Sequence, residues 1–182
     1  MTRGHQERLA PMVRDLMAAT GLGFDAVDRV GVTVGPGSFT GLRVGLAFAK
    51  GLALALNRPC VGVGTLAALA ESVEGDGPLA TAIDAGLGRV YLQIFDNRAP
   101  LAEAVILAVD AAIARLAAAF PSGDYVVAGP GAALFADAAA SARWAAITVP
   151  DPRAVARLAA SAPVATPRPL YLRPPDATAK AA

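Results

Sequence analysis

The chain has 182 residues, of which 55% are hydrophobic and 17% charged, and its formal net charge is +1. This composition is typical of a globular chain with room for one domain or two small lobes, and it excludes general disorder. A net charge this small does not attract nucleic acid by itself. Contact with RNA would therefore need a local basic patch or a more basic partner. Cys60 is the single cysteine, which excludes an internal disulfide. His5 is the single histidine, so the sequence has too few cysteine and histidine ligands for a zinc site.

The N-terminal third begins with a predicted amphipathic helix at His5–Thr20. Pro11 within it implies either a late start of the helix or a kink. Its polar start carries no signal peptide, and no uncharged apolar run approaches the roughly 18 residues of a membrane span. We therefore expect a cytoplasmic protein with no membrane contact. The apolar residues of this helix recur at helical spacing and are Leu9, Met12, Val13, Leu16 and Met17.

A glycine-rich turn follows the strand predicted at Val30–Val34. Gly35 and Gly37 permit positive φ, and Ser38 is a good N-cap for a helix predicted over Ser38–Leu56. A turn between a strand and a helix can hold a phosphate on its free N–H groups, or it can be a structural corner, which is the favoured reading. Because no Gly-Lys-Ser/Thr follows, the turn is not a P-loop.

The helix Ser38–Leu56 is apolar on nearly every side, and Lys50 is the only charge after Val44. Such a helix is expected to be buried on more than one side. Two readings stay open: it is a central core helix, or part of its surface meets a helix from another chain. Small residues at successive i, i+4 positions form a stripe for close approach, namely Gly41, Gly45, Ala49 and Ala53.

Further strands and helices alternate along the rest of the chain, which indicates α/β architecture. The polar, glycine-rich segment Glu74–Pro78 is the best candidate for a boundary between lobes. Strands are predicted at Val61–Gly64, Leu79–Ile83, Arg89–Phe95, Tyr125–Ala128 and Ala146–Val149, and helices at Thr65–Ser72, Ala108–Phe120, Gly131–Ser141 and Asp151–Ala160.

Asp84 ends a predicted strand just before a glycine-rich turn, and Arg89 begins the next strand. One reading has the carboxylate hold a cation near a nucleotide phosphate. The other has Asp84 accept hydrogen bonds from the N–H groups of the turn and pair with Arg89. The second reading is favoured, because no other carboxylate is placed to converge with Asp84.

Several stretches of the chain carry long, specific motifs. They are Arg8–Met12, the run Gly35–Gly45 with its continuation through Lys50–Ala53 to Val61–Leu66, Ile83–Ala85 with Arg89–Tyr91, and Pro169–Arg173. Together they resemble the bacterial TsaB family, also called YeaZ, over nearly the whole chain. The part between Phe95 and Ala160 matches the family only loosely.

The resemblance implies an actin/Hsp70-like (ASKHA) two-lobe α/β fold without catalytic residues. Family members are partners of TsaD, which transfers a threonylcarbamoyl group to the tRNA adenosine beside the anticodon, and of the ATPase TsaE. The resemblance thus implies a non-catalytic scaffold subunit that meets tRNA only through the complex. It implies no cofactor on this chain, and ATP and a metal ion on the partner subunits.

Within the family, the helices that match His5–Thr20 and Ser38–Leu56 pack against the same helices of TsaD or of a second TsaB. The resemblance therefore places partner-binding residues at Leu9, Met12, Val13, Leu16, Gly41, Arg43, Gly45, Phe48, Ala49 and Leu52. A nucleotide or turn site would comprise Gly35, Gly37, Ser38, Asp84 and Arg89.

Family members begin with a hairpin and a third strand, whereas this sequence starts at the first helix. We therefore expect an incomplete N-terminal lobe at 1–74 that holds the partner-binding helices, a C-terminal lobe at 79–173 and a disordered tail at 174–182. Either the true start lies upstream, or the chain is a truncated copy. Nucleotide binding is doubtful, because the missing segment carries the first phosphate-binding turn. Two alternatives remain: a stand-alone nucleotide-dependent phosphotransferase or hydrolase that uses Asp84, and a poorly folded product without activity.

Overall fold

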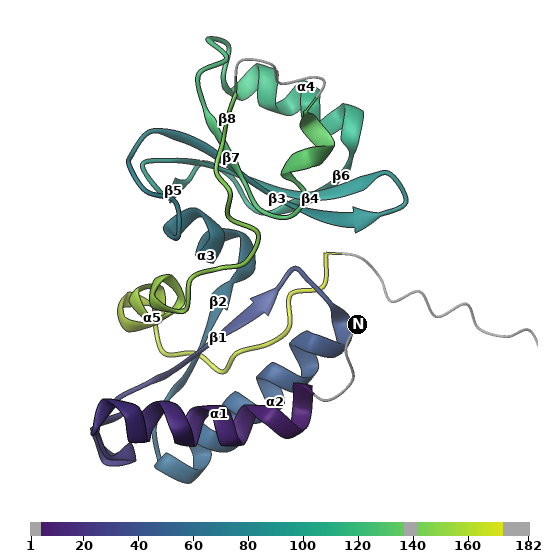
Figure 1. The fold of residues 1–182 in the computed structure, drawn as a ribbon. Helices are drawn as coiled ribbons and strands as arrows, with labels where there is room; N and C mark the ends of the chain where they lie inside the picture. Colours follow the sequence, from purple (N-terminus) through teal and green to yellow (C-terminus); the bar gives the residue numbers. More distant parts are fainter. Residues whose placement is uncertain (1–4, 137–141, 173–182) are drawn as a thin grey trace, which may run out of the picture.

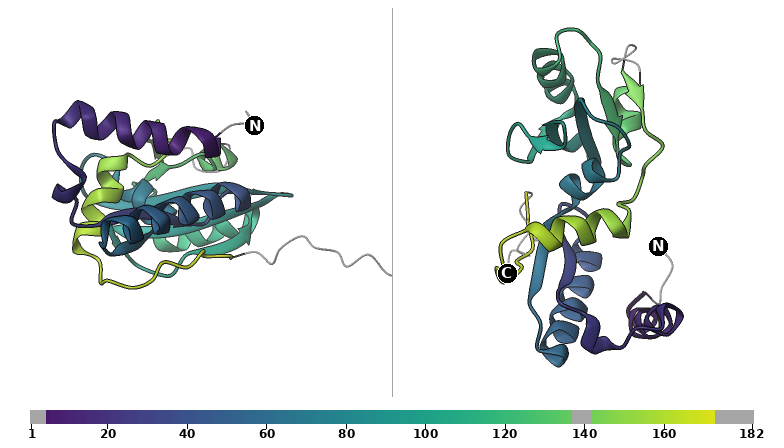
Figure 2. Two further views of the ribbon diagram at one scale, coloured as in Figure 1. Left: turned by 90° about the horizontal axis from the view of Figure 1, so that it is seen from below. Right: turned by 90° about the vertical axis from the view of Figure 1, so that its left-hand side faces the viewer.

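Two β-sheets organise the chain, which the computed structural model describes over residues 5–136 and 142–172. The smaller sheet lies with α1 and α2 at one end of the molecule, and the larger sheet lies with α4 at the other end (Figure 1). Helices α3 and α5 lie where the two lobes meet (Figure 2). The predicted α/β architecture is confirmed.

The smaller sheet consists of β1 (Val30–Gly35) and β2 (Cys60–Gly64). The two strands are parallel, with Val32 opposite Gly62. A parallel pair needs a crossover connection, and α2 (Phe39–Leu56) supplies it. This part of the fold follows the predicted order of strand, glycine turn, helix and strand.

Helices cover both faces of the smaller sheet. A Cβ added to Gly45 of α2 would lie 4.0 Å from Val32 Cγ2, and one added to Gly31 would lie 2.7 Å from Ala159 Cβ of α5 (Pro152–Ser161). Neighbouring residues of a strand point to opposite faces. Helix α2 therefore covers one face of the sheet and α5 the other.

Helix α1 (His5–Thr20) has the predicted bounds, includes Pro11, and is followed by the short η1 (Phe24–Ala26). None of the α1 residues whose burial is described is fully buried. Its Arg14–Asp15 ion pair is on the surface, where such pairs add little stability. Helix α1 is therefore held to the lobe by only part of one face.

The larger sheet has the strand order β5-β4-β3-β7-β8, and β6 also pairs with β4. Strands β3 and β4 are antiparallel, whereas β7 is parallel to both β3 and β8. The strands are β3 (Pro78–Gly86), β4 (Arg89–Asp96), β5 (Ala99–Pro100), β6 (Val105–Ala108), β7 (Val126–Ala128) and β8 (Arg143–Trp144).

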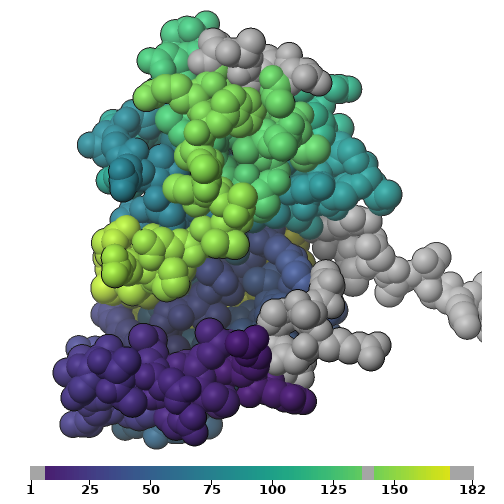
Figure 3. All heavy atoms as spheres, viewed as in Figure 1, coloured from purple at the N-terminus to yellow at the C-terminus, as the bar shows by residue number. Residues whose placement is uncertain are grey.

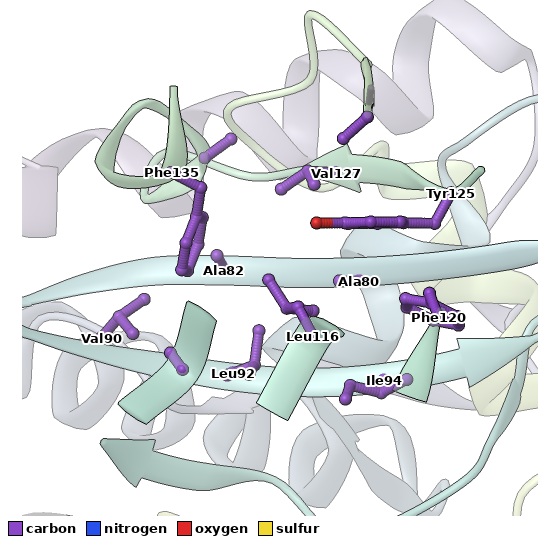
Figure 4. Close-up of a cluster of buried hydrophobic side chains, with 13 residues drawn as sticks. Ala80, Ala82, Val90, Leu92, Ile94, Leu116, Phe120, Tyr125, Val127 and Phe135 are labelled. Carbon is purple, nitrogen blue, oxygen red and sulfur yellow. The ribbon is translucent and has the colours of Figure 1, made fainter. Parts of the chain in front are cut away.

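A hydrophobic core lies between this sheet and the helices α4 (Val109–Ala119) and η2 (Ala132–Phe135). Phe120 stacks on Tyr125 with 4.8 Å between ring centroids. Figure 4 shows Leu116 and Phe135 pointing at β3 and β4 from opposite directions. This well-filled core gives the second lobe its own source of stability.

Polar contacts join the two lobes at α3 (Thr65–Glu71). The buried Thr81 of β3 donates its hydroxyl hydrogen to the Leu66 carbonyl at 3.1 Å. Within the first lobe, Arg157 of α5 donates to the Glu71 carboxylate of α3 at 2.7 Å. Asp151 caps α5, as predicted, by accepting from the Arg153 amide at 2.8 Å.

The C-terminal segment returns to the first lobe, so the predicted C-terminal lobe at 79–173 is wrong from α5 onward. Pro167 lies over Gly62, with its Cβ 3.0 Å from a Cβ built there, and the Leu170 amide donates to the Val34 carbonyl at 2.7 Å. A two-stranded sheet exposes its second face unless another element covers it, and α5 does so. Such a long-range contact leaves no local sequence pattern.

Three further element predictions need correction or fall outside the described residues. The predicted strand Ala146–Val149 is not assigned as a strand, although the Ile147 carbonyl accepts from the Gly129 amide at 2.8 Å, and the pairing strand is instead Arg143–Trp144. The predicted helix Gly131–Ser141 is a short 3-10 helix at Ala132–Phe135, and residues 137–141 lie outside the described part. The predicted disordered tail 174–182 lies outside it too.

Candidate partner-binding surface

One face of α2 packs on the smaller sheet, and the other faces outward. Ser38 is the N-cap, as predicted, and its hydroxyl accepts from the Gly41 amide at 3.4 Å. Leu54 is 84% exposed, so the expectation that α2 is buried on more than one side is wrong within this chain. The reason is that one small sheet covers only one side. The buried residues of α2 are Leu42, Leu46, Ala49 and Ala53.

The residues of the predicted small-residue stripe become more buried from the N-terminal to the C-terminal end of α2. Gly41 is exposed, Gly45 is half-buried against Val32, and Ala49 and Ala53 are buried. Ala49 is therefore not available to a partner, which corrects its assignment to the partner-binding set. The stripe instead lets α2 approach its own strand β1 closely.

Apolar side chains of α1 remain exposed or half-exposed beside α2. Met12 is 59% exposed and Leu16 is 61% exposed, while Leu9 and Val13 are half-buried. Figure 3 shows α1 as a ridge on the surface of the first lobe. Between α1 and α2 lies an apolar groove of about 390 Å³, lined by Ala10, Val13, Phe24, Ala47, Phe48, Gly51 and Leu52.

A cluster of two aromatic rings and a guanidinium lies at the N-terminal end of α2. The Arg43 guanidinium lies 3.8 Å from the centroid of the Phe39 ring, and its Nε donates to the Tyr171 hydroxyl at 3.2 Å. The centroids of the Phe39 and Tyr171 rings are 5.4 Å apart. Cation–π contact and the hydrogen bond together hold Arg43 in place and tie the C-terminal segment to α2.

The Gly35–Ser38 turn has the geometry of a corner. Gly35 has a φ of 115°, and a Cβ there would lie 2.8 Å from the Leu170 carbonyl oxygen. Gly37 is exposed and does not use a positive φ. Of these two glycines, only Gly35 must lack a side chain, because the C-terminal segment approaches it closely.

Asp84 binds its own turn, which is the favoured reading of the sequence. Its carboxylate accepts from the Gly86 amide at 2.7 Å. Among the described residues no ion pair joins it to Arg89, although Arg89 pairs with Gly86 across the hairpin. Asp84 lies near the end of β3 in the larger sheet, whereas the Gly35–Ser38 turn lies at the end of β1 in the smaller one, and no hydrogen bond links them in the described structure.

The titratable groups offer little that resembles acid–base machinery. Burial raises the pKa of the Cys60 thiol above its ordinary value of 9.0, although nearby Lys50 opposes the shift. Burial also raises the pKa of Tyr125. Both groups are therefore neutral at pH 7. The described residues contain no group of three or more histidines, cysteines or carboxylates that could hold a metal ion.

Helix α2 also has the length and composition of a membrane span, with 18 residues and a mean hydropathy of 1.4. It contains Arg43 and Lys50, and its buried face packs on β1. A single helix of this kind is weak support for a span, because core and interface helices of other proteins meet the same criteria.

Comparison with known proteins connects this surface to a family. The sequence profile of a family described as TsaD, tRNA N6-adenosine threonylcarbamoyltransferase, matches residues 1–174. A protein named tRNA threonylcarbamoyladenosine biosynthesis protein TsaB, from Escherichia coli K12, is 39% identical over 92 residues, 49% of this chain and 40% of that protein. The structure of YeaZ from Pseudomonas aeruginosa superposes with a TM-score of 0.77 at 29% identity, over 94% of this chain and 86% of that one.

This chain belongs to the TsaD family, in its TsaB (YeaZ) group. The alignment with the curated TsaB proteins spans about two-fifths of their length. A tRNA N6-adenosine threonylcarbamoyltransferase of Moorella thermoacetica is 48% identical, but over only 62 residues, or 18% of its length. The predicted family and its actin/Hsp70-like fold are confirmed.

In this TsaB-family chain, six contributors to the surface lie outside the predicted partner-binding set, namely Ala10, Phe24, Phe39, Ala47, Gly51 and Tyr171. Phe24 lines the groove from η1, and Tyr171 holds Arg43 from the far end of the chain. Tyr171 does belong to the C-terminal motif Pro169–Arg173, so the motif marked a residue whose neighbours only the fold reveals.

Proposed function

We propose that this chain is a non-catalytic subunit in the formation of tRNA threonylcarbamoyladenosine. It acts by holding a TsaD-like catalytic subunit through α1 and α2. A TsaE-like ATPase joins the complex, ATP and a metal ion reside on the partner subunits, and tRNA is met only through the assembly.

The observation that carries this proposal is the apolar surface of α1 and α2. Met12 and Leu16 stay about three-fifths exposed, and a groove of about 390 Å³ lies beside them. Contiguous apolar surface of this kind is typical of a protein interaction site. The names of the TsaB relatives place those proteins in threonylcarbamoyladenosine biosynthesis.

A subunit role also fits the polar groups of this chain. The Asp84 carboxylate accepts from the Gly86 amide of its own turn, and the C-terminal segment packs against Gly35. Two residues that a stand-alone phosphotransferase would use, Asp84 and Gly35, thus take part in local structure. This favours a scaffold over the enzyme alternative.

The test is co-expression of the chain with the TsaD of the same organism, followed by pull-down and gel filtration. A stoichiometric complex supports the proposal, and failure to form one contradicts it. ATP turnover by the chain alone, abolished in Asp84→Asn, would instead support the stand-alone phosphotransferase or hydrolase. A chain that shows no cooperative melt by circular dichroism would indicate a poorly folded product.

A further inference from the structure

The C-terminal segment is attached to the first lobe at three places, and Figure 1 shows it in yellow, passing from α5 to the end of β1. Pro167 is buried over Gly62 of β2. The Leu170 amide donates to the Val34 carbonyl in β1 at 2.7 Å. The third attachment is the Tyr171 side chain, which lies against the N-terminal end of α2. The first two attachments use a proline ring and the backbone, so they do not require that tyrosine.

Tyr171 contacts two side chains from the first turns of α2. Its hydroxyl accepts from Arg43 Nε at 3.2 Å, and its ring centroid lies 5.4 Å from that of Phe39. The Arg43 guanidinium in turn lies 3.8 Å from the Phe39 ring centroid. Each of the three side chains therefore contacts the other two, and together they form a surface cluster, defined here as Phe39, Arg43 and Tyr171.

The surface cluster contributes little to the stability of the fold. Phe39 and Tyr171 are each 43% exposed, and Arg43 is exposed as well. Changes to exposed side chains usually alter the free energy of unfolding only slightly. Tyrosine and arginine are, by contrast, enriched among the few residues that supply most of the binding energy at protein interfaces. The residue types of the cluster therefore suit binding better than packing.

Arg43 keeps donors that a partner could use. Its Nε–H is bound to Tyr171, but none of the ion pairs in the described part of the chain includes Arg43. An unrestrained arginine side chain samples many rotamers and loses that freedom when it binds. The contacts with Phe39 and Tyr171 already restrict the guanidinium in the isolated chain. Less conformational entropy is therefore left to lose when a partner arrives.

We propose that Tyr171 is a positioning residue of the partner-binding surface, which acts by holding Arg43 against Phe39. The C-terminal segment is thereby part of the binding unit, although it belongs to neither α1 nor α2. Tyr171 acts through Arg43 and does not itself have to contact the partner. This proposal rests on the proposed function, because the partner to be tested is the TsaD-like subunit.

The test is a double-mutant cycle in the full chain, with Tyr171→Phe and Arg43→Ala made singly and together. Phenylalanine keeps the ring beside Phe39 and removes only the hydroxyl that Arg43 binds. Titration calorimetry against TsaD should show about two- to tenfold weaker binding for Tyr171→Phe. When Arg43→Ala is already present, Tyr171→Phe should cause no further loss. The matched control is Tyr91→Phe, the same change at a half-buried tyrosine of β4, which should bind like the unmodified chain.

A second measurement needs no partner. In the isolated chain, the Arg43 Nε–H should exchange slowly with water by NMR, and it should exchange faster in Tyr171→Phe because its acceptor is gone. Circular dichroism melts should give the same Tm for both chains. A purely structural role of Tyr171 would instead lower the Tm and weaken binding equally with and without Arg43.

Three results would overturn the proposal: unchanged exchange of the Arg43 Nε–H, full affinity of Tyr171→Phe for TsaD, or the same loss of affinity in the Arg43→Ala background. If the unmodified chain does not bind TsaD, the proposed function fails and the positioning role fails with it. If Tyr171→Phe and the unmodified chain bind TsaD equally well, the proposed function stands and only the positioning role is lost.

Discussion

Truncation of two exposed side chains on α1 should weaken partner binding and leave the fold intact. The double change is Met12→Ala with Leu16→Ala, which keeps a good helix former at both positions. The two side chains are 59% and 61% exposed, so they contribute little to the stability of the isolated chain. Surface changes of this kind usually shift the free energy of unfolding by no more than about 0.5 kcal/mol.

The effect on binding follows from the area that a partner would still have to cover. Complete burial of a leucine or methionine side chain is worth about 1.5–3 kcal/mol. With three-fifths of each side chain still exposed, a partner gains about 1–2 kcal/mol from each, or about 2–4 kcal/mol from both. The dissociation constant should therefore rise about 30- to 700-fold. The lower end is expected, because alanine keeps one carbon of each side chain.

Titration calorimetry against TsaD measures the affinity, and circular dichroism melts measure the fold. The matched control is Leu101→Ala with Val164→Ala, whose side chains are 59% and 61% exposed but belong to neither α1 nor α2. This control should bind TsaD like the unmodified chain. An unchanged dissociation constant for the α1 variant, or an equal loss in the control, would refute the reasoning.

Three further predictions concern the fold and its titration. Ala49→Leu overfills the contact of α2 with its own sheet, so it should lower stability by about 1–3 kcal/mol, and an unchanged Tm would show that Ala49 is not confined. Thr81→Val leaves the Leu66 carbonyl without its buried donor and should cost about 1–3 kcal/mol in urea unfolding, unlike a change at exposed Thr148. Because burial raises the pKa of Cys60, the folded state holds that proton more tightly than the unfolded state, so stability should fall as pH rises above 9.0. Unfolding free energies at pH 8 and 10 should show a smaller fall in Cys60→Ser than in the unmodified chain, and equal falls would contradict this.

Elements whose signals are local could be predicted from the sequence. Helix α1 begins and ends at the predicted residues, and Ser38 and Asp151 both cap helices as expected. Caps and helical periodicity depend on residues within one or two turns, so a single sequence displays them.

The incorrect predictions concern segments that contact residues far away in the sequence. Helix α5 and the segment through Leu170 return to β1 from more than a hundred residues away, which no local pattern records. Likewise, β8 falls at Arg143–Trp144 because β7 is there to pair with it. Both residues are exposed, so the strand lacks the alternating pattern by which strands are recognised.

Only part of the candidate surface could be predicted from the sequence, for a related reason. In most surface helices, the contrast between apolar and charged residues shows which side faces the core. Helix α2 lacks that contrast, and its two sides differ instead in shape and in the placing of two cations. The side with small residues and leucines packs on β1, whereas the side with Phe39, Arg43 and Lys50 faces outward. Because its own sheet needs only the first side, the apolar residues that remain outside are explained better by a partner than by the core of this chain.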